Sequence, residues 1–170
     1  MLIIIILAII FCVIKYLKRS YKELIELREM RNQCLENLER ALGQRYDVME
    51  EMIEFSSGFI DGENEFVAKL LQVKLVPTSE RLSLEKELVT ELNKLIFKIN
   101  EVPQLKNDQD FTALRLKLAK AEKAISEAKA SLNERSKGYN DLISGFPRNI
   151  IAKVCKFKKF QVYEVEYITR

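Results

Sequence analysis

Apolar residues fill positions 1–14 without one polar side chain among them. As a helix this run is roughly 21 Å long, whereas the hydrocarbon core of a bilayer is roughly 30 Å thick. Residues 15–18 can extend the helix, since their aliphatic or aromatic bodies stay in the apolar zone while their polar ends reach the headgroups. The pattern therefore predicts an N-terminal transmembrane anchor at residues 1–18.

A cleaved signal peptide is the rival interpretation of this run. No basic side chain precedes it and no small-x-small cleavage site follows it, so a retained anchor is favoured. The basic residues flank its other end: Lys15, Lys18, Arg19 and Lys22. By the positive-inside rule we expect a single-pass protein of the cell membrane whose C-terminal domain is cytoplasmic.

Residues 16–59 contain no Pro and predict one long helix that continues out of the anchor. Apolar residues recur at steps of three and four, which marks one buried face. They are Leu24, Leu27, Cys34, Leu35, Leu38, Leu42, Met49, Met52, Ile53 and Phe59. Gly58 and Gly62 bracket the expected end of this helix.

Two further helices are predicted before Pro103. The first runs over residues 63–76 and ends at Pro77, with Phe66, Leu70, Leu71 and Val73 as its apolar residues. The second has helical spacing at Leu84, Leu88, Leu92, Leu95, Ile96 and Ile99.

The last long helix follows the N-cap candidates at residues 107–110 and ends at Gly145 and Pro147. Its expected buried stripe is Phe111, Leu114, Leu118, Ala121, Ile125, Ala128, Leu132, Tyr139 and Leu142. A short helix is predicted over residues 148–155. Beyond it, the alternation of Tyr163, Val165 and Tyr167 with acids predicts an extended tail, which must dock, pair or stay disordered.

These elements predict an all-α fold: a transmembrane anchor, then an antiparallel up-and-down bundle of long helices, then a short C-terminal helix and an extended tail. The expected boundaries are residues 1–18 for the anchor, 19–146 for the bundle and 147–170 for the C-terminal piece.

Composition narrows the possible chemistry. The 170 residues include no His, which removes the commonest general base, the His-dependent nucleophile pairs and most zinc or di-iron ligand sets. The three cysteines are far apart in sequence and form no CxxC motif, so no disulfide framework is expected. A net charge of +3 is too small to argue for nucleic acid. We therefore expect no enzyme activity, no cofactor, no metal site and no nucleic-acid partner.

Several motifs resemble the LemA family. They are Arg45-Tyr46-Asp47, residues 108–118, Pro103-x-Leu105-Lys106, Tyr139-Asn140 and Phe146-Pro147-x-Asn149-x-Ile151-Ala152. The last two form the most specific block, and the resemblance runs from the anchor to about Phe160. It implies a short N-terminal membrane anchor followed by an antiparallel helical bundle, and it implies no established biochemical activity.

The chain departs from the family pattern at two places. Residues 48–51 hold no Pro where the family usually has one, which puts a bend of the first helix in doubt. Gly62-Glu63 stands where the family often has His-Glu.

Two groups of residues are candidate contact sites. Arg45, Tyr46 and Asp47, with Tyr139 and Asn140, either contact a partner or form a polar network that pins the first helix to the last. The acid-free run of Arg148, Lys153, Lys156, Lys158 and Lys159 is a candidate basic surface. The expected topology places that run far from the anchor of its own chain, which favours a solvated basic end over a lipid contact.

The acidic residues Asp47, Glu50, Glu51 and Glu54 share one side of a helix. A carboxylate metal site is conceivable there, but without His a solvated acidic face is the expected interpretation.

Taken together, the sequence predicts a non-enzymatic scaffold or adaptor for other membrane or envelope proteins. The alternative is a self-assembling protein that organises or remodels the membrane. The sequence does not identify the protein partners, and a second copy of the chain is one candidate.

Overall fold

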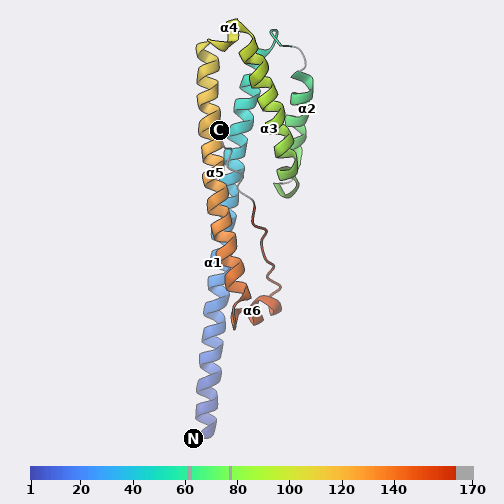
Figure 1. The fold of residues 1–170 in the computed structure, drawn as a ribbon. Coiled ribbons are helices and arrows are strands. Elements are labelled where there is room, and N and C mark those ends of the chain that lie inside the picture. The colour runs from blue at the N-terminus through green and yellow to red at the C-terminus, as the bar shows by residue number, and fades with distance from the viewer. Residues whose placement is uncertain (61–62, 77, 164–170) are drawn as a thin grey trace. The chain divides into compact units, whose positions relative to one another are not determined.

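The computed structural model describes residues 1–60, 63–76 and 78–163. Within these ranges the elements are helices and no strand occurs, so the all-α prediction is confirmed (Figure 1). The helices are α1 (Leu2–Ser56), α2 (Glu63–Leu75), α3 (Thr78–Glu101), α4 (Pro103–Lys106), α5 (Gln109–Ser144) and α6 (Arg148–Val154). Their bounds follow the sequence prediction closely, except that the short α4 was not expected.

The helices divide into two compact units, and α1 and α5 contribute to both. The terminal unit consists of Met1–Leu38 and Ser126–Arg170, and the central unit is Glu39–Ile125. The expected boundaries at residues 18 and 146 stay predictions.

The predicted first helix is continuous, since α1 runs unbroken from the apolar N-terminus to Ser56. Gly43 lies within it, and a Cβ built at Gly43 would meet no heavy atom within 4 Å. After the last turn, Gly58 has a φ of 85°, a left-handed conformation that glycine adopts without steric cost. The prediction that Phe59 belongs to the buried face is wrong, because Phe59 lies beyond the end of the helix and is exposed. Gly62 and Pro77 lie outside the described residues.

In the central unit, α1 and α5 run antiparallel. Three contacts show the register: Arg45 with Glu122, Glu51 with Lys117, and Phe55 stacked on Phe111 at 5.9 Å between ring centroids. The partner number on α5 falls as the number on α1 rises, as antiparallel packing requires. The buried apolar residues of this unit come from α1, α2, α3, α4 and α5; they include Met49, Met52, Phe66, Leu70, Val73, Leu88, Leu92, Ile99, Leu105 and Phe111. Leu71, predicted as an apolar contributor of α2, is exposed instead.

The start of α5 confirms one of the cap candidates. A carboxylate oxygen of Asp108 accepts a hydrogen bond from the Asp110 amide at 2.7 Å, and the Asp108 carbonyl accepts one from the Thr112 amide. Such a contact satisfies an amide that the helix itself leaves without a partner.

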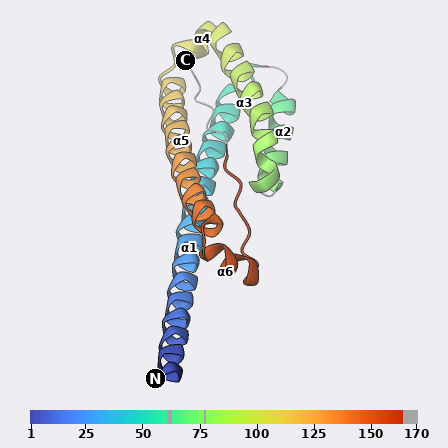
Figure 2. The same ribbon diagram turned by 60° about the horizontal axis from the view of Figure 1, so that its bottom comes forward.

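The terminal unit has a small core of its own. Leu24 of α1, Tyr139 and Ile143 of α5, and Ile151 and Ala152 of α6 form a buried cluster. Leu27, Leu142, Phe157 and Phe160 pack around it. The short helix α6 thus docks through one face onto α1 and α5 (Figures 1 and 2).

The chain leaves α6 through a Schellman-type turn. The Phe157 amide donates to the Ala152 carbonyl at 2.9 Å and the Lys156 amide to the Lys153 carbonyl at 3.2 Å. These are the two bonds of that motif, and Lys156 occupies its left-handed position with a φ of 56°. The turn returns Phe157 to the core, where its ring lies 5.9 Å from that of Tyr21.

The segment after this turn docks along α5, one of the fates expected for an extended tail. Asn140 binds the backbone of Phe160 and Asn133 binds the backbone of Tyr163, each through both its amide oxygen and its amide nitrogen. The two asparagines are about 10.5 Å apart along a helix and the two bound residues about 10 Å apart along an extended chain, so the spacings match. Most of the alternating pattern predicted around Val165 and Tyr167 lies outside the described residues.

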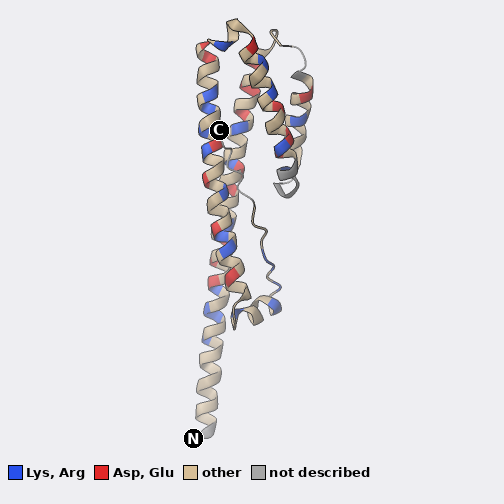
Figure 3. Cartoon of the chain, viewed as in Figure 1, with Lys and Arg blue, Asp and Glu red and all other residues tan. Residues whose placement is uncertain are grey.

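The N-terminal end of α1 presents its apolar side chains to the surroundings. From Ile3 to Ile14 the large hydrophobic residues are 46% to 72% exposed, and Figure 3 shows no charge on this part of the helix. Over the described ranges, we find no helix with a stretch long and apolar enough to cross a membrane. The transmembrane part of the prediction for residues 1–18 is not supported by this finding.

Candidate functional site

The central unit contains a buried polar network built on Arg45 and Tyr46. The Arg45 guanidinium forms ion pairs with Glu85 of α3 and, at 3.2 Å, with Glu122 of α5. The Tyr46 hydroxyl donates a hydrogen bond to the Glu85 carboxylate. Arg45 and Tyr46 are each 3% exposed and Glu85 is 7% exposed. One arginine thus links α1, α3 and α5 inside the unit.

Burial affects the Tyr46 hydroxyl of this network. Desolvation raises the pKa of the Tyr46 hydroxyl above its usual range, and the charges of Arg45 and Arg81 only partly oppose that rise. The phenol therefore stays neutral at physiological pH and serves as a donor. A buried, charge-paired group of this kind fixes the positions of the helices that it joins. Because its side chains are buried, they are not available to a substrate.

The sequence prediction missed both acids of the network. Glu85 lies on the same face of α3 as Leu88, Leu92 and Leu95, which are all buried. The position of an acid on an apolar stripe could have indicated this network, because a buried carboxylate requires a cationic partner.

Asp47 differs from its two neighbours because its side chain is exposed. On the acidic side of α1, Glu50 is paired with Lys74 of α2 and Glu51 with Lys117 of α5, each at 2.5 Å. Within the described part of the chain, no group of three or more His, Cys, Asp or Glu residues is arranged to hold a metal ion.

Tyr139 and Asn140 lie in the terminal unit, where both hold the C-terminal segment. Tyr139 is fully buried, with its ring 4.8 Å from that of Phe160. Asn140 accepts a hydrogen bond from the Phe160 amide at 2.8 Å and donates one to the Phe160 carbonyl at 2.7 Å. The guanidinium of Arg31 lies 4.2 Å from the centre of the same ring. Phe160 is therefore enclosed by α1 and α5.

The candidate basic surface divides into one paired residue and four exposed ones. Arg148 donates to Glu23 of α1 at 2.8 Å. The four lysines are exposed: Lys153, Lys156, Lys158 and Lys159.

The expectation that this run lies far from the N-terminal apolar helix is wrong. Arg148, Ile151 and Phe157 contact Glu23, Leu24 and Tyr21 respectively, within two turns of the basic cluster that flanks the apolar run. The physical reason is that α6 folds back onto α1 to bury Ile151 and Ala152, so its position is set by long-range packing.

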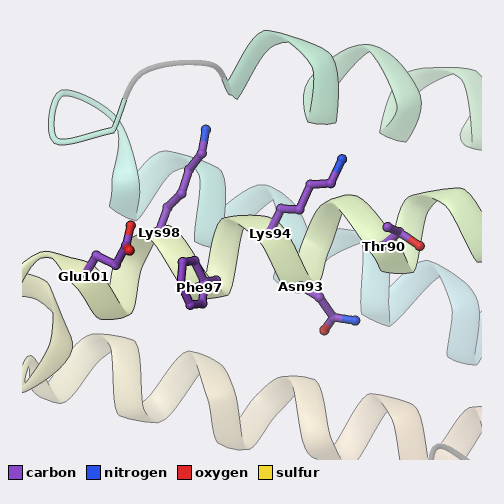
Figure 4. A pocket seen from close by; sticks show the side chains of 6 residues that line it. All are labelled: Thr90, Asn93, Lys94, Phe97, Lys98 and Glu101. Atoms are coloured by element: carbon purple, nitrogen blue, oxygen red, sulfur yellow. The ribbon is translucent and has the colours of Figure 1, made fainter.

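One hollow in the described residues of the central unit lies on α3 (Figure 4). It has a volume of about 560 Å³ and is lined by Thr90, Asn93, Lys94, Phe97, Lys98 and Glu101. All six side chains come from one helix, with Lys94 and Lys98 extending to one side and Asn93 to the other. A smaller hollow of about 110 Å³ adjoins Glu91, whose pKa is lowered by a hydrogen bond from Lys94. The first hollow draws on a single helix. The second takes Glu65 from α2 and Glu91, Lys94 and Lys98 from α3, but it is smaller than the roughly 300 Å³ of a typical ligand pocket.

The three cysteines are free, with Cys12 and Cys155 exposed and Cys34 partly buried. Cys155 follows α6, two residues beyond Lys153 and next to Lys156.

Comparison with known families gives a match over most of the chain. A model of the LemA family matches residues 34–170, a range that contains the Arg45 network, the Asn140 contact and α6. The chain belongs to the LemA family. A comparison of this LemA-family chain with curated proteins found no match. The matched range thus includes the buried polar groups that join helices, and the LemA family is not known as a family of enzymes.

Proposed function

We propose that this LemA-family chain is a non-enzymatic scaffold or adaptor attached to a membrane by the N-terminal end of α1. The observation that carries the proposal is the exposed apolar surface of residues 3–14, followed directly by Lys15, Lys18, Arg19 and Lys22. An apolar helix end of this size is unfavourable in water, because each buried CH₂ gains about 0.8 kcal/mol. Insertion of that end into lipid removes the apolar side chains from water and places the basic residues at the headgroups.

The interior of the helical units supports a binding role over catalysis. The buried polar groups described above pair with one another, as Arg45 does with Glu85 and Glu122. What these helices offer a partner is a rigid charged surface.

Membrane attachment is tested by fractionating cells that contain the full chain or a variant with Ile5→Arg and Ile9→Arg. We expect the full chain to sediment with membranes and resist carbonate extraction, and the variant to become extractable. Ala8→Ser is the control, since it lies in the same run and adds no charge. A full chain that carbonate releases would overturn the attachment.

The cytoplasmic orientation has its own test. Protease added to intact cells should leave the helical units whole, and protease added after permeabilisation should digest them. Cleavage in intact cells would reverse the proposed orientation.

The adaptor role is tested by in-cell crosslinking at exposed lysines of the central unit, followed by identification of the captured proteins. Recurrent capture of the same membrane or envelope proteins is the expected result. Recovery of crosslinks within this chain alone would contradict the adaptor role.

Self-assembly is a second candidate, favoured by exposed apolar side chains on the central unit. Leu71 and Leu75 of α2 and Phe97 of α3 are between 52% and 85% exposed. Light scattering of the full chain in mild detergent distinguishes the two, since a strict monomer rules against self-assembly.

A further inference from the structure

The outer face of α6 carries apolar side chains that the fold leaves uncovered. Phe146 is 83% exposed, Ile150 53% and Val154 77%, whereas Ile151 and Ala152 on the inner face are buried. Ile150 and Val154 are four residues apart in α6, so they lie along one side of the helix, and Phe146 lies in the turn two residues before it. The helix therefore has one apolar face in the core and another toward the surroundings.

Exposed lysines lie on α6 and on the segment that follows it. Lys153, Lys156, Lys158 and Lys159 are exposed, and no Asp or Glu occurs anywhere in residues 142–163. Lys156 is held outward by the left-handed turn that returns Phe157 to the core. The combination of exposed aromatic and aliphatic groups with several lysines is typical of helices that lie in the headgroup region of a membrane. It is unlike the centre of a protein interface, where lysine is depleted.

The terminal unit places this surface close to the apolar helix end. The inner face of α6 and the turn after it contact Tyr21, Glu23 and Leu24 of α1. Tyr21 lies seven residues after Ile14, which is about 10 Å along a helix. That distance is comparable to the headgroup layer of a bilayer whose hydrocarbon core holds residues 3–14.

We propose that α6 and the turn after it form a second membrane contact, which binds anionic phospholipid headgroups of the same bilayer. Phe146, Ile150 and Val154 enter the interface, and Lys153, Lys156, Lys158 and Lys159 lie against the phosphates. This proposal rests on the attachment proposed above, but it adds a lipid preference that the apolar helix end cannot supply. Each near-surface lysine contributes about fivefold to partitioning, so the four together distinguish anionic from neutral membranes.

The two contacts can be followed separately, because the chain has a cysteine in each. Full-length protein is labelled with an environment-sensitive fluorophore at Cys155 in a background of Cys12→Ala and Cys34→Ala. A second preparation is labelled at Cys12 in a background of Cys34→Ala and Cys155→Ala. Each is mixed with vesicles of phosphatidylcholine alone or with about 30 mol% phosphatidylglycerol, a content that gives an anionic surface.

We expect the emission of the Cys12 label to shift to shorter wavelength with both kinds of vesicle. The emission of the Cys155 label should shift only with the anionic vesicles. The Cys155 response should be lost in about 0.5 M NaCl, where the Debye length is roughly 4 Å. A Cys12 response with an unchanged Cys155 label overturns the second contact and leaves the attachment standing. A Cys155 response without a Cys12 response supports the lipid contact of α6 and overturns the attachment through α1. If neither label responds, both the attachment and the second contact are overturned.

Two other outcomes also overturn the second contact. An equal Cys155 response to neutral and anionic vesicles shows apolar insertion without headgroup recognition. A blue shift that forms without vesicles and disappears on dilution assigns the surface to a second copy of the chain.

Charge variants give an independent test. Replacement of Lys153, Lys156, Lys158 and Lys159 by Gln should weaken the Cys155 response to anionic vesicles at least about tenfold. The matched control replaces four other exposed cations by Gln, namely Lys106, Lys120, Arg135 and Lys137, and changes the net charge equally. Circular dichroism and urea unfolding establish that both variants are folded. Equal losses in the two variants would overturn the specific role of α6.

Discussion

Asn140 holds Phe160 by two hydrogen bonds, accepting one from its amide at 2.8 Å and donating one to its carbonyl at 2.7 Å. An asparagine side chain has the same pair of groups as a backbone peptide, so α5 binds the extended segment as a neighbouring strand would. Asn133 repeats the arrangement with Tyr163, two turns earlier on α5. The segment that follows α6 is thereby fixed without any sheet.

Asn140→Ala should release this segment. The Phe160 amide and carbonyl lose their partners, and each loss costs about 1–3 kcal/mol if the group stays buried and less where water replaces the bond. We expect faster amide exchange at Phe160 and faster chymotrypsin cleavage beside it. Asn140→Asp retains the acceptor and loses the donor, so its effect should be intermediate. Asn93→Ala, at an exposed position of α3, is the control, and equal protection in Asn140→Ala and Asn93→Ala would refute the role of Asn140.

Arg45→Met should destabilise the central unit by about 3–5 kcal/mol, since it leaves the buried carboxylate of Glu85 without its cation. Adding Glu85→Leu and Tyr46→Phe in the same chain removes the two buried polar partners and should recover much of that loss, since the remaining partner, Glu122, is partly exposed to water. Urea unfolding followed by circular dichroism measures both. If the triple variant is less stable than Arg45→Met, the network stabilises the fold by more than the pairing of its charges.

Alkaline pH should weaken the fold through its buried tyrosines. Burial raises the pKa of Tyr139 above its usual value of 10.0, and the charge of Arg28 offsets only part of the rise. Because the folded-state pKa is the higher one, this contribution is fully present below pH 10 and is lost as the pH rises through the folded-state pKa. Unfolding midpoints measured from pH 8 to pH 11 should therefore fall less steeply in Tyr139→Phe than in the unaltered chain. Tyr16→Phe, at an exposed position, is the control.

Lys156→Gly should stabilise the terminal unit. A side chain at a left-handed position costs about 1–2 kcal/mol, which glycine avoids. Glycine also adds entropy to the unfolded chain, and this offsets about 0.4–1 kcal/mol of the gain in stability. We expect a net gain of about 0.5–1 kcal/mol by thermal unfolding. Lys153→Gly removes the same charge inside α6 and should instead cost about 1 kcal/mol. A loss of stability in Lys156→Gly would show that the lysine side chain itself supports the turn.

Local sequence patterns are enough to predict the helices and most of their buried faces. Steps of three and four placed Leu24, Leu38, Leu42, Met49 and Met52 on one side of α1, and all five are buried. This succeeded because helical periodicity is local: it depends on residues within two turns of one another. Pro103, Gly145 and Pro147 marked helix ends for the same reason, since their effects on the backbone act within a few residues.

The burial of particular polar residues and the position of α6 depend on contacts between distant parts of the chain. Glu85 and Glu122 meet Arg45 across gaps of 40 and 77 residues, and Arg148 meets Glu23 across 125. Spacing along one helix cannot encode such pairs, because they form only when separate elements pack together to bury their apolar faces. The position of the basic residues beside the apolar end of α1, on which the lipid contact depends, arises from that same packing.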